Sequence, residues 1–242
     1  MEAADSRTIA PARKADNRRR APIRKPSRSE LARSPREVLV DGAASKADVY
    51  VVDLGQGPMV VKDFDAKPWW GRWMGRILVW RELRAYQALS GVRGIAPLVG
   101  RIDAHALAVE KIAGERMFTS SKRFACGEAW LAVLRAVLDE VHARGIAHLD
   151  MRGRENVLVD GEGQVYLIDF QSAVRLRPGG LGHRALFHWF KAADDSALLK
   201  WREQIAPQSM TAEDRRLLER HERIRGLWPF NRKRSRSREG RA

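Results

Sequence analysis

Hydrophobic residues alternate with polar ones in short runs over the segment that follows residue 36. Residues 37–41, 48–54 and 58–64 are rich in valine, and the glycine-containing segments GAASKA and GQG separate them. Alternating runs bounded by such turns predict an antiparallel β-meander. Residues 97–102 and 107–112 are two further strand candidates.

A longer periodicity, of three to four residues, predicts helices in two places. Apolar residues recur at this spacing over residues 76–90, and Gly91 follows them. Residues 128–144 carry a continuous apolar stripe before Gly145, and glycine is a usual helix stop. The stripe consists of Trp130, Val133, Leu134, Val137, Leu138 and Val141.

Two more short strands, residues 156–159 and 165–169, flank the turn DGEGQ, and the chain beyond them is helical in character. A sheet, one helix, further strands and then mostly helices are typical of an α+β protein with two lobes. We expect a β-rich N-terminal lobe over residues 37–112 and a short α-rich C-terminal lobe over residues 113–230, joined at AGERM. A cleft between lobes is a usual place for a ligand.

The formal net charge of +15 is concentrated at the two ends of the chain. Residues 1–37 carry +6 and residues 231–242 carry +5. Residues 1–36 hold almost no large apolar side chains, so we expect them, like residues 231–242, to form disordered basic tails. Such tails either bind nucleic acid or anionic membrane through phosphate contacts, or only keep the protein in solution.

Several features bear on where the protein works. No apolar secretory core is visible near the N-terminus, and no run approaches the ~20 residues of a membrane-spanning helix. The single cysteine, Cys126, has no partner for an internal disulfide, which fits a reducing compartment. We expect a cytoplasmic protein, or one held peripherally at the inner face of the membrane.

Polar side chains that suit phosphoryl transfer lie in the stretch HLDMRGRENVLVDGEGQVYLIDFQS, residues 148–172. Asn156 begins one short strand and Asp169 ends the next, so the open end of a hairpin would bring both side chains together. Amide and carboxylate oxygens are ligands that Mg²⁺ prefers. Asp150, one loop earlier, is then left to orient an attacking hydroxyl.

The same stretch resembles the catalytic loop and metal-binding aspartate of the protein-kinase-like fold, whose signatures are H-R-D-L-x-x-x-N and D-F-G. It looks closest to the RIO-type and bacterial lipopolysaccharide-core kinase branches, and the resemblance covers residues 37 to about 175. SKADVYVV is similar to the short phosphate-loop region of the RIO type. The resemblance implies a two-lobed kinase fold that uses ATP and Mg²⁺.

Each matching position takes an expected role from this resemblance. Asp150 matches the base that orients the hydroxyl, and Arg152 matches a basic residue that contacts the transferred phosphate. Asn156 and Asp169 match the metal ligands. The expected nucleotide contacts are Lys62 at the phosphates, Glu82 as the partner of that lysine, Ser45 and Lys46 in the phosphate loop, and Glu110 and Ile112 at the adenine hinge.

One of these pairings is also expected on physical grounds. Glu82 lies three residues after Val79 and four before Tyr86, beside the inward face of its helix. A buried glutamate is costly without a cationic partner, and Lys62 stands among valines on a strand with the complementary need. The alternative is that both side chains reach solvent, as charged side chains usually do.

The sequence departs from the protein-kinase signatures at several positions. Leu149 stands where H-R-D has arginine, and Gln171 stands where D-F-G has glycine. Asp150 and Asn156 are one residue further apart than in eukaryotic kinases, as in the bacterial sugar-kinase branch. No APE-like segment follows Asp169, so control by a phosphorylated activation loop is not expected.

Tryptophan and arginine interleave just before and within the first predicted helix. A membrane-surface patch is one interpretation of this pattern. We favour packing of a helix extension against the N-terminal lobe, because interfacial helices usually divide their faces more cleanly. The residues are Trp69, Trp70, Trp73 and Trp80 with Arg72, Arg76 and Arg81. Of the histidines, His148 is expected to brace the catalytic loop.

Taken together, the residues predict a kinase that transfers the γ-phosphoryl group of ATP to a hydroxyl, with Ser or Thr of a protein as the first choice. A lipopolysaccharide-core sugar is the alternative acceptor, favoured by the Trp/Arg pattern and the longer catalytic loop. A non-catalytic scaffold that binds nucleic acid or membrane through the basic tails is a second class of function. A scaffold has no need for Lys62, Asp150, Asn156 and Asp169 together, which argues against it.

Overall fold

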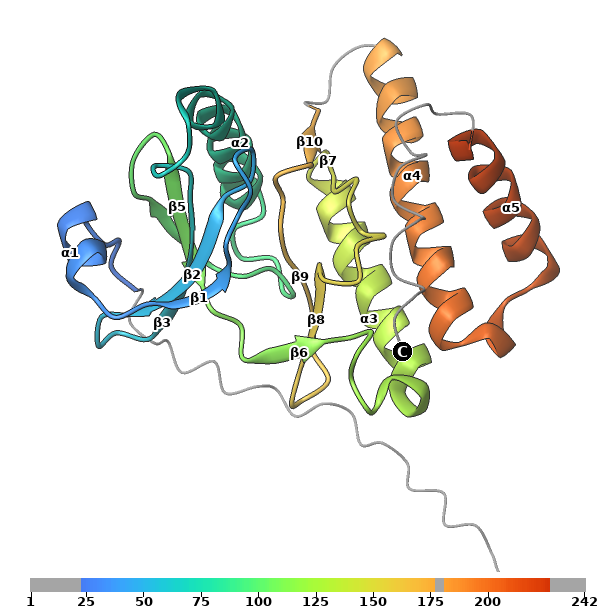
Figure 1. The fold of residues 1–242 in the computed structure, drawn as a ribbon. Helices are drawn as coiled ribbons and strands as arrows, with labels where there is room; N and C mark the ends of the chain where they lie inside the picture. The colour runs from blue at the N-terminus through green and yellow to red at the C-terminus, as the bar shows by residue number, and fades with distance from the viewer. Residues whose placement is uncertain (1–22, 177–180, 227–242) are drawn as a thin grey trace, which may run out of the picture.

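The computed structural model describes residues 23–176 and 181–226 (Figure 1). A β-rich N-terminal part precedes a mainly helical C-terminal part, so the α+β class is as predicted. The predicted tail at residues 231–242 lies outside the described residues, as do residues 1–22 of the other tail.

Five antiparallel strands form the sheet of the N-terminal lobe: β1 (Glu37–Val40), β2 (Asp48–Asp53), β3 (Pro58–Asp63), β4 (Leu98–Arg101) and β5 (Ala106–Glu110). Their order in the sheet is β1-β2-β3-β5-β4. The first three strands pair in the order of the chain, which confirms the predicted meander. Strand β5 then inserts between β3 and β4.

Strand β3 presents its side chains alternately to the two faces of the sheet, as strand geometry requires. Met59 and Val61 belong to a small cluster on the outer face. Val60 packs against the main core on the inner face, and Lys62 reaches from that face to helix α2 (Trp69–Ala88). Because side chains alternate along β3, Lys62 points into the interior on the same side as Val60.

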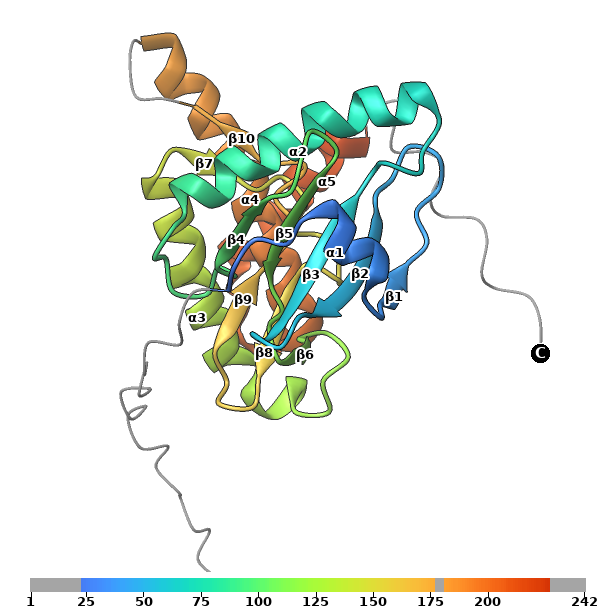
Figure 2. The same cartoon turned by 90° about the vertical axis from the view of Figure 1, so that its left-hand side faces the viewer.

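Residues 23–36 are part of the folded lobe, so the prediction of a disordered segment is wrong for them. Helix α1 (Arg28–Arg33) begins with a capping box in which Ser27 and Glu30 satisfy each other's backbone N–H groups. Leu31 is buried in the outer cluster, and α1 lies across the outer face of the sheet (Figure 2).

Arg28 anchors this helix to the sheet through two carboxylates. Its Nε donates to Asp103 at 2.5 Å, and its Nη2 donates to Asp63 at 3.1 Å. The Tyr50 hydroxyl also donates to Asp63, at 3.1 Å. Low apolar content predicted disorder, but one leucine and one arginine find partners on strands that are distant in sequence.

Helix α2 begins at Trp69, seven residues before the predicted start at residue 76. Two glycines let this first part of the helix approach the lobe closely. A Cβ atom at Gly75 would lie 2.4 Å from Cγ of Phe64, and one at Gly71 would lie 2.2 Å from the carbonyl oxygen of Ala44. The helix extension therefore packs through its glycines.

The described part of the C-terminal lobe contains three long helices, α3 (Arg123–Ala143), α4 (Leu181–Ile205) and α5 (Ala212–Gly226), with a short 3₁₀ helix at Pro207–Ser209. The predicted helix at residues 128–144 is confirmed as α3, which begins five residues earlier. The three helices follow one another outward from the small sheet of this lobe (Figure 1).

That small sheet has three strands, β6 (Gly114–Arg116), β8 (Val157–Asp160) and β9 (Val165–Leu167), and β7 (Ile146–Ala147) pairs separately with β10 (Val174–Arg175). The chain leaves the large sheet after Glu110 and enters the small one at Gly114, within the segment expected to join the lobes. One core cluster continues from Phe64 and Leu107 in the first lobe to Leu134 in the second. None of the described helices has the length and apolar character needed to cross a membrane.

Candidate active site

A buried ammonium group joins the two lobes. Lys62 Nζ on β3 donates to Glu82 Oε1 on α2 at 2.6 Å and to Asp169 Oδ1 at 2.8 Å. Glu82 is fully buried, and Lys62 is almost so. The alternative that these two side chains reach solvent is therefore wrong, and Lys62 and Asp169 face one shared site.

The charges of this group hold one another in place. Burial works to lower the pKa of Lys62, but the carboxylates of Glu82 and Asp169 outweigh it and raise that pKa above its ordinary value. Burial also works to raise the pKa of Asp169, and the ammonium of Lys62 outweighs it and keeps the pKa low. Burial raises the pKa of Glu82, against the pull of Lys62. The ammonium of Lys62 thus pairs with the carboxylates of both Glu82 and Asp169.

Asn156 and Asp169 meet at the open end of a hairpin, as predicted. Strands β8 and β9 pair with Val157 opposite Leu167, and the Ile168 N–H donates to the Asn156 carbonyl at 3.0 Å. The pairing through the DGEGQ turn is therefore confirmed. It places Asn156 beside the residue that precedes Asp169.

Asp150 lies next to Asn156 on residues 148–156, the segment expected to act as a catalytic loop and called by that name below. The Asn156 side-chain Nδ2 donates to the Asp150 backbone carbonyl at 2.8 Å and to its Oδ2 at 3.1 Å. Asp150 is exposed, whereas Asn156 is buried. A buried amide therefore holds a carboxylate that is open to an incoming molecule.

The backbone is strained at two points of this site. Among the described residues, Leu149 (φ 66°) and Asp169 (φ 67°) are the non-glycine residues with positive φ. Such conformations persist only where surrounding contacts enforce them. Buried Asp194 on α4 accepts from the backbone N–H of His148 at 2.7 Å and of Leu149 at 2.8 Å.

His148 braces the loop from inside, which agrees with its expected role. Its Nε2 donates to the Ile168 carbonyl at 3.0 Å, and its Nδ1 accepts from the Asp150 N–H at 3.3 Å. Its ring also packs edge-on against Phe170, which packs in turn against Tyr86 of α2. Three packed rings, those of His148, Phe170 and Tyr86, therefore connect the catalytic loop, the residue after Asp169 and helix α2.

Asp194 is the functional residue that sequence reasoning missed. It lies 44 residues after Asp150 in the middle of a helix, and it supports a strained loop that only the fold brings to it. The available signal was weak: an Asp-Asp pair at residues 194–195, of which Asp194 falls on the buried face of α4. Nothing in the local sequence identifies its partners.

Other predicted site residues are not drawn into this network. Arg152 turns toward the C-terminal helices, where its Nη2 donates to Ser196 Oγ at 3.2 Å and its Nη1 lies 3.9 Å from Glu222. Its expected contact with a transferred phosphate stays a prediction.

The expected phosphate loop is a short turn between β1 and β2. Ser45 is half-buried and Lys46 is exposed, and the Lys46 N–H donates to the Ala43 carbonyl at 2.7 Å. Lys67 holds the turn in place, since its Nζ donates to the Gly42 carbonyl at 2.6 Å. The roles of Ser45 and Lys46 stay predictions.

The expected adenine hinge lies at the end of β5. The Glu110 N–H donates to the Pro97 carbonyl and the Lys111 N–H donates to the Pro58 carbonyl, so both amides are used by the sheet. Ile112 is half-buried against the main core. An adenine ring here would have to meet the carbonyl of Glu110 or the amide of Ile112, which stays a prediction.

The donor set of the hairpin end fits Mg²⁺. No group of three or more His, Cys, Asp or Glu side chains suited to a metal is present in the described part of the chain. Mg²⁺ needs only one or two protein oxygens when phosphates and waters complete its shell. The Asn156 amide nitrogen is taken up by Asp150, so a metal ligand from this side chain would have to be its oxygen, and Asp169 would add a carboxylate.

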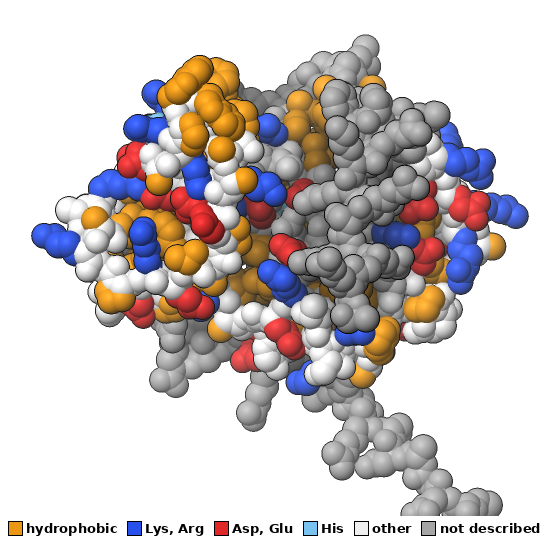
Figure 3. Space-filling model, viewed as in Figure 1, with side chains coloured by type: hydrophobic (Ala, Val, Ile, Leu, Met, Phe, Trp, Pro, Cys, Tyr) orange, Lys and Arg blue, Asp and Glu red, His pale blue; other side chains and the backbone are white. Residues whose placement is uncertain are grey.

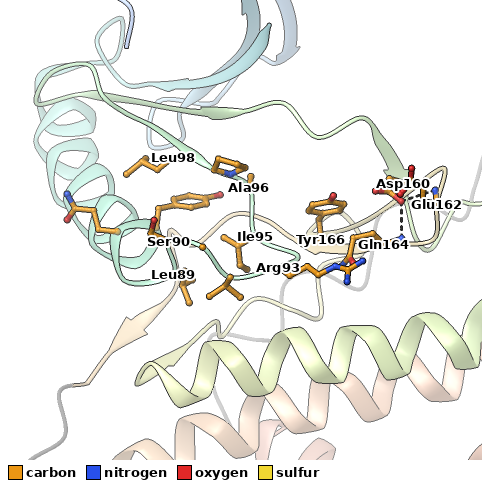
Figure 4. A pocket seen from close by; sticks show the side chains of 15 residues that line it. Leu89, Ser90, Arg93, Ile95, Ala96, Leu98, Asp160, Glu162, Gln164 and Tyr166 are labelled. Atoms are coloured by element: carbon orange, nitrogen blue, oxygen red, sulfur yellow. Dashed lines mark hydrogen bonds between the residues drawn. The ribbon is translucent and has the colours of Figure 1, made fainter. Parts of the chain in front are cut away.

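A separate cavity of about 840 Å³ lies between the C-terminal end of α2 and the β8–β9 turn (Figure 4). The end of α2, the loop that follows it and the β8–β9 turn surround it, with Arg93, Asp160 and Tyr166 among its lining residues. Its lining, among the described residues, does not include Lys62, Asp150, Asn156 or Asp169. It is distinct from the candidate active site.

The β-rich lobe contributes Lys62, the helix on it contributes Glu82, and the α-rich lobe contributes Asp150, Asn156 and Asp169. This arrangement defines the protein-kinase-like fold. The chain has this fold, and solved structures of a RIO-type kinase share it. No protein-family model and no curated protein matches the sequence.

Two solved structures of Rio2 kinase from Chaetomium thermophilum match this chain. The complex with ADP/Mg²⁺ and phosphoaspartate has a TM-score of 0.56 at 16% identity and covers 79% of this chain, which spans 63% of that chain. The second structure has a TM-score of 0.53 at 13% identity, with 82% and 76% covered. Likeness at such identities concerns the fold, and function must be argued from the site.

Proposed function

We propose that the protein is an ATP- and Mg²⁺-dependent phosphotransferase that moves the γ-phosphoryl group to a hydroxyl. The observation that carries this proposal is the position of Lys62, which bridges Glu82 on α2 and Asp169 beside the hairpin end. Phosphoryl transfer depends on positioning and on charge stabilisation more than on covalent help from the protein. This site offers both.

Each residue has a defined task in this proposal. Lys62 supplies a positive charge for the nucleotide phosphates, and Glu82 holds its ammonium in place. Asn156 and Asp169 hold Mg²⁺, which when bound neutralises charge on the phosphates. Asp150, held by Asn156 and open to solvent, orients the attacking hydroxyl and accepts its proton.

The nucleotide is proposed to lie between the lobes, with Glu110 and Ile112 at its adenine ring and with Ser45 and Lys46 near its phosphates. One fold neighbour was solved with ADP and Mg²⁺, which supports a nucleotide site in this fold. We propose Ser or Thr of a protein as the acceptor and the cytoplasm, or its membrane boundary, as the location. A lipopolysaccharide-core sugar is the competing acceptor, and the Asp150–Asn156 spacing favours it.

Incubation of the purified full chain with radiolabelled γ-phosphate ATP and Mg²⁺ tests the proposal. Wild type is expected to label itself or an added acceptor, and excess EDTA is expected to abolish the labelling. Asp169→Ala is expected to lose about 100-fold or more of the rate, because a charged ligand of the metal is removed. Asp139→Ala, an exposed aspartate on α3, is the matched control and is expected to keep the rate.

The chemistry of the product separates the acceptors. A protein acceptor yields phosphoserine or phosphothreonine after acid hydrolysis of the labelled protein, whereas a sugar acceptor carries the label into the lipopolysaccharide fraction. Wild type that neither binds ATP nor transfers phosphate in the presence of Mg²⁺ would contradict the proposal and leave the scaffold function in its place.

A further inference from the structure

The outer face of α2 carries a row of large apolar side chains that nothing in the described structure covers. Trp69 is 82% exposed, Trp73 is 62% exposed and Trp80 is 52% exposed, which is far from the usual state of tryptophan. The rest of the row consists of Trp70, Met74 and Ile77, all exposed. Exposed apolar patches of this kind mark interaction sites.

Helical spacing places these side chains on one side of the helix. Trp69, Trp73 and Trp80 lie four and seven residues apart, so they share a face. The opposite face is buried against the lobe through Gly71, Gly75, Val79, Glu82, Ala85 and Tyr86. Helix α2 thus has two apolar faces, and only one of them belongs to the core. The helix extension packs against the lobe, as we favoured, but it does so through its glycines, and the tryptophans face outward.

The charged side chains that α2 places beside this row are all positive. Arg72, Arg76, Arg81 and Arg84 are its charged residues apart from Glu82, which is buried against Lys62. Arg84 stacks over the Trp80 ring at 5.1 Å, and Arg101 of β4 lines a shallow groove with Trp73 and Trp80. Asp65, which lies 3.3 Å from Arg72, is the acidic neighbour at the start of the helix.

Figure 3 shows the consequence on the surface, where apolar side chains gather over α2 beside lysine and arginine side chains. Tryptophan is amphipathic and partitions to the boundary between headgroups and acyl chains, while arginine pairs with anionic headgroups. The exposed face of α2 combines tryptophans with arginines beside them, so it matches the headgroup region of a bilayer in both apolar character and charge.

We propose that this face of α2 docks the protein onto an anionic bilayer surface. Trp69, Trp73 and Trp80 enter the interface, and Arg76 and Arg84 beside them contact the phosphate-bearing headgroups. The same helix presents Glu82 to Lys62 from its buried face, so docking would fix the orientation of the candidate cleft relative to the membrane. The docking does not depend on the proposed activity.

Sedimentation of the full chain with lipid vesicles tests the docking. Vesicles of phosphatidylcholine with phosphatidylglycerol are expected to bind the protein about tenfold or more tightly than vesicles of phosphatidylcholine alone, because the arginines act on the anionic lipid. The triple variant Trp69→Ser/Trp73→Ser/Trp80→Ser is expected to lose about tenfold or more of the binding to anionic vesicles. Tryptophan fluorescence should shift to the blue on binding of wild type only.

A matched control is available at the far end of the molecule. Phe124 is 65% exposed at the start of α3 and stacks with Arg123 at 4.4 Å, so it repeats the aromatic and arginine pairing outside the row. Phe124→Ser is expected to leave vesicle binding unchanged. Arg76→Gln/Arg84→Gln is expected to weaken binding to anionic vesicles and to leave the weak binding to neutral vesicles as it is.

Three results would overturn the docking. Wild type that binds neither kind of vesicle would exclude it, and equal binding by wild type and the triple variant would assign the binding to other basic parts of the chain. A triple variant that changes its size in solution, with no wild-type affinity for vesicles, would make the row a protein interface. Circular dichroism should show the same fold for every variant, because the substituted side chains are exposed apart from Arg84, which is half-buried.

Discussion

Individual side chains hold the candidate site in a backbone conformation that it does not adopt by preference. The left-handed conformations of Leu149 and Asp169 cost about 1–2 kcal/mol each. Asp194 opposes this cost with its hydrogen bonds to the backbone of the catalytic loop, and His148 adds one bond to each of the two segments. Local strain is therefore supported by buried polar residues.

The buried state of His148 makes stability depend on pH. Burial lowers the pKa of His148 below its ordinary value of 6.5, although the carboxylate of Asp194 opposes this. Below that pH the unfolded chain binds a proton that the folded chain rejects. The free energy of unfolding should therefore fall as the pH decreases from about 6.5 toward the folded-state pKa, and no such loss should occur above about 6.5.

Thermal melts between about pH 7.5 and 5.5 measure this effect. His148→Gln keeps a side-chain N–H for the Ile168 carbonyl but does not titrate. It should be less stable than wild type at the upper pH and should show a flatter dependence on pH. An equally steep loss in His148→Gln would assign the effect to another group.

At the scale of elements, two helices that lie on the sheet of the first lobe are anchored in different ways. Helix α1 is short and depends on its cap, on Leu31 and on Arg28. Helix α2 is long, packs through glycines and is tied to the other lobe by Arg81, whose Nη2 donates to the Ala173 carbonyl at 3.1 Å. Both helices act on β3, the strand that carries Lys62.

Helix α1 should contribute measurably to stability through Arg28. Arg28→Ala removes the partner of Asp63 and Asp103 and should lower the free energy of unfolding by about 2–3 kcal/mol. Arg33→Ala, on the exposed side of the same helix, is the control and should change little. Urea unfolding measures both variants. Equal stability of Arg28→Ala and wild type would show that α1 is only loosely held.

At the scale of the whole molecule, the two lobes share one core and meet at the candidate site. Ile95 pairs with Leu167 across the junction, and Lys62 reaches Asp169 from the other lobe. Two carboxylates face one ammonium there, so a bound cation would complete the balance of charge. A nucleotide that binds between the lobes with its metal should stabilise both lobes together, because it binds the folded chain and not the unfolded one.

Addition of ADP with Mg²⁺ at about 100 times its dissociation constant should raise the free energy of unfolding by about 2.7 kcal/mol. For a chain of this size that corresponds to a rise in Tm of about 5–10 °C. ADP with EDTA should give a smaller rise, and Asp169→Asn should remove the difference between the two conditions. A Tm unaffected by the nucleotide would argue against the proposed site.

Much of this arrangement was predictable from short-range patterns. The meander, the β8–β9 hairpin and the pairing of Lys62 with Glu82 follow from alternation, from turn residues and from the need of a buried charge for a partner. Helix α1 was predictable in part, because Ser27 and Glu30 form a capping-box pattern before Leu31. The low apolar content of the segment pointed the other way.

By itself, the sequence determined the order of the elements and the residues that could meet a nucleotide, because periodicity and charge act between near neighbours. The tertiary structure decided which partners these residues have. Asp194 supports the catalytic loop, Arg152 turns to α4 and α5, and the tryptophans of α2 face outward. Each of these outcomes depends on contacts between segments far apart in the chain, and no local pattern encodes such contacts.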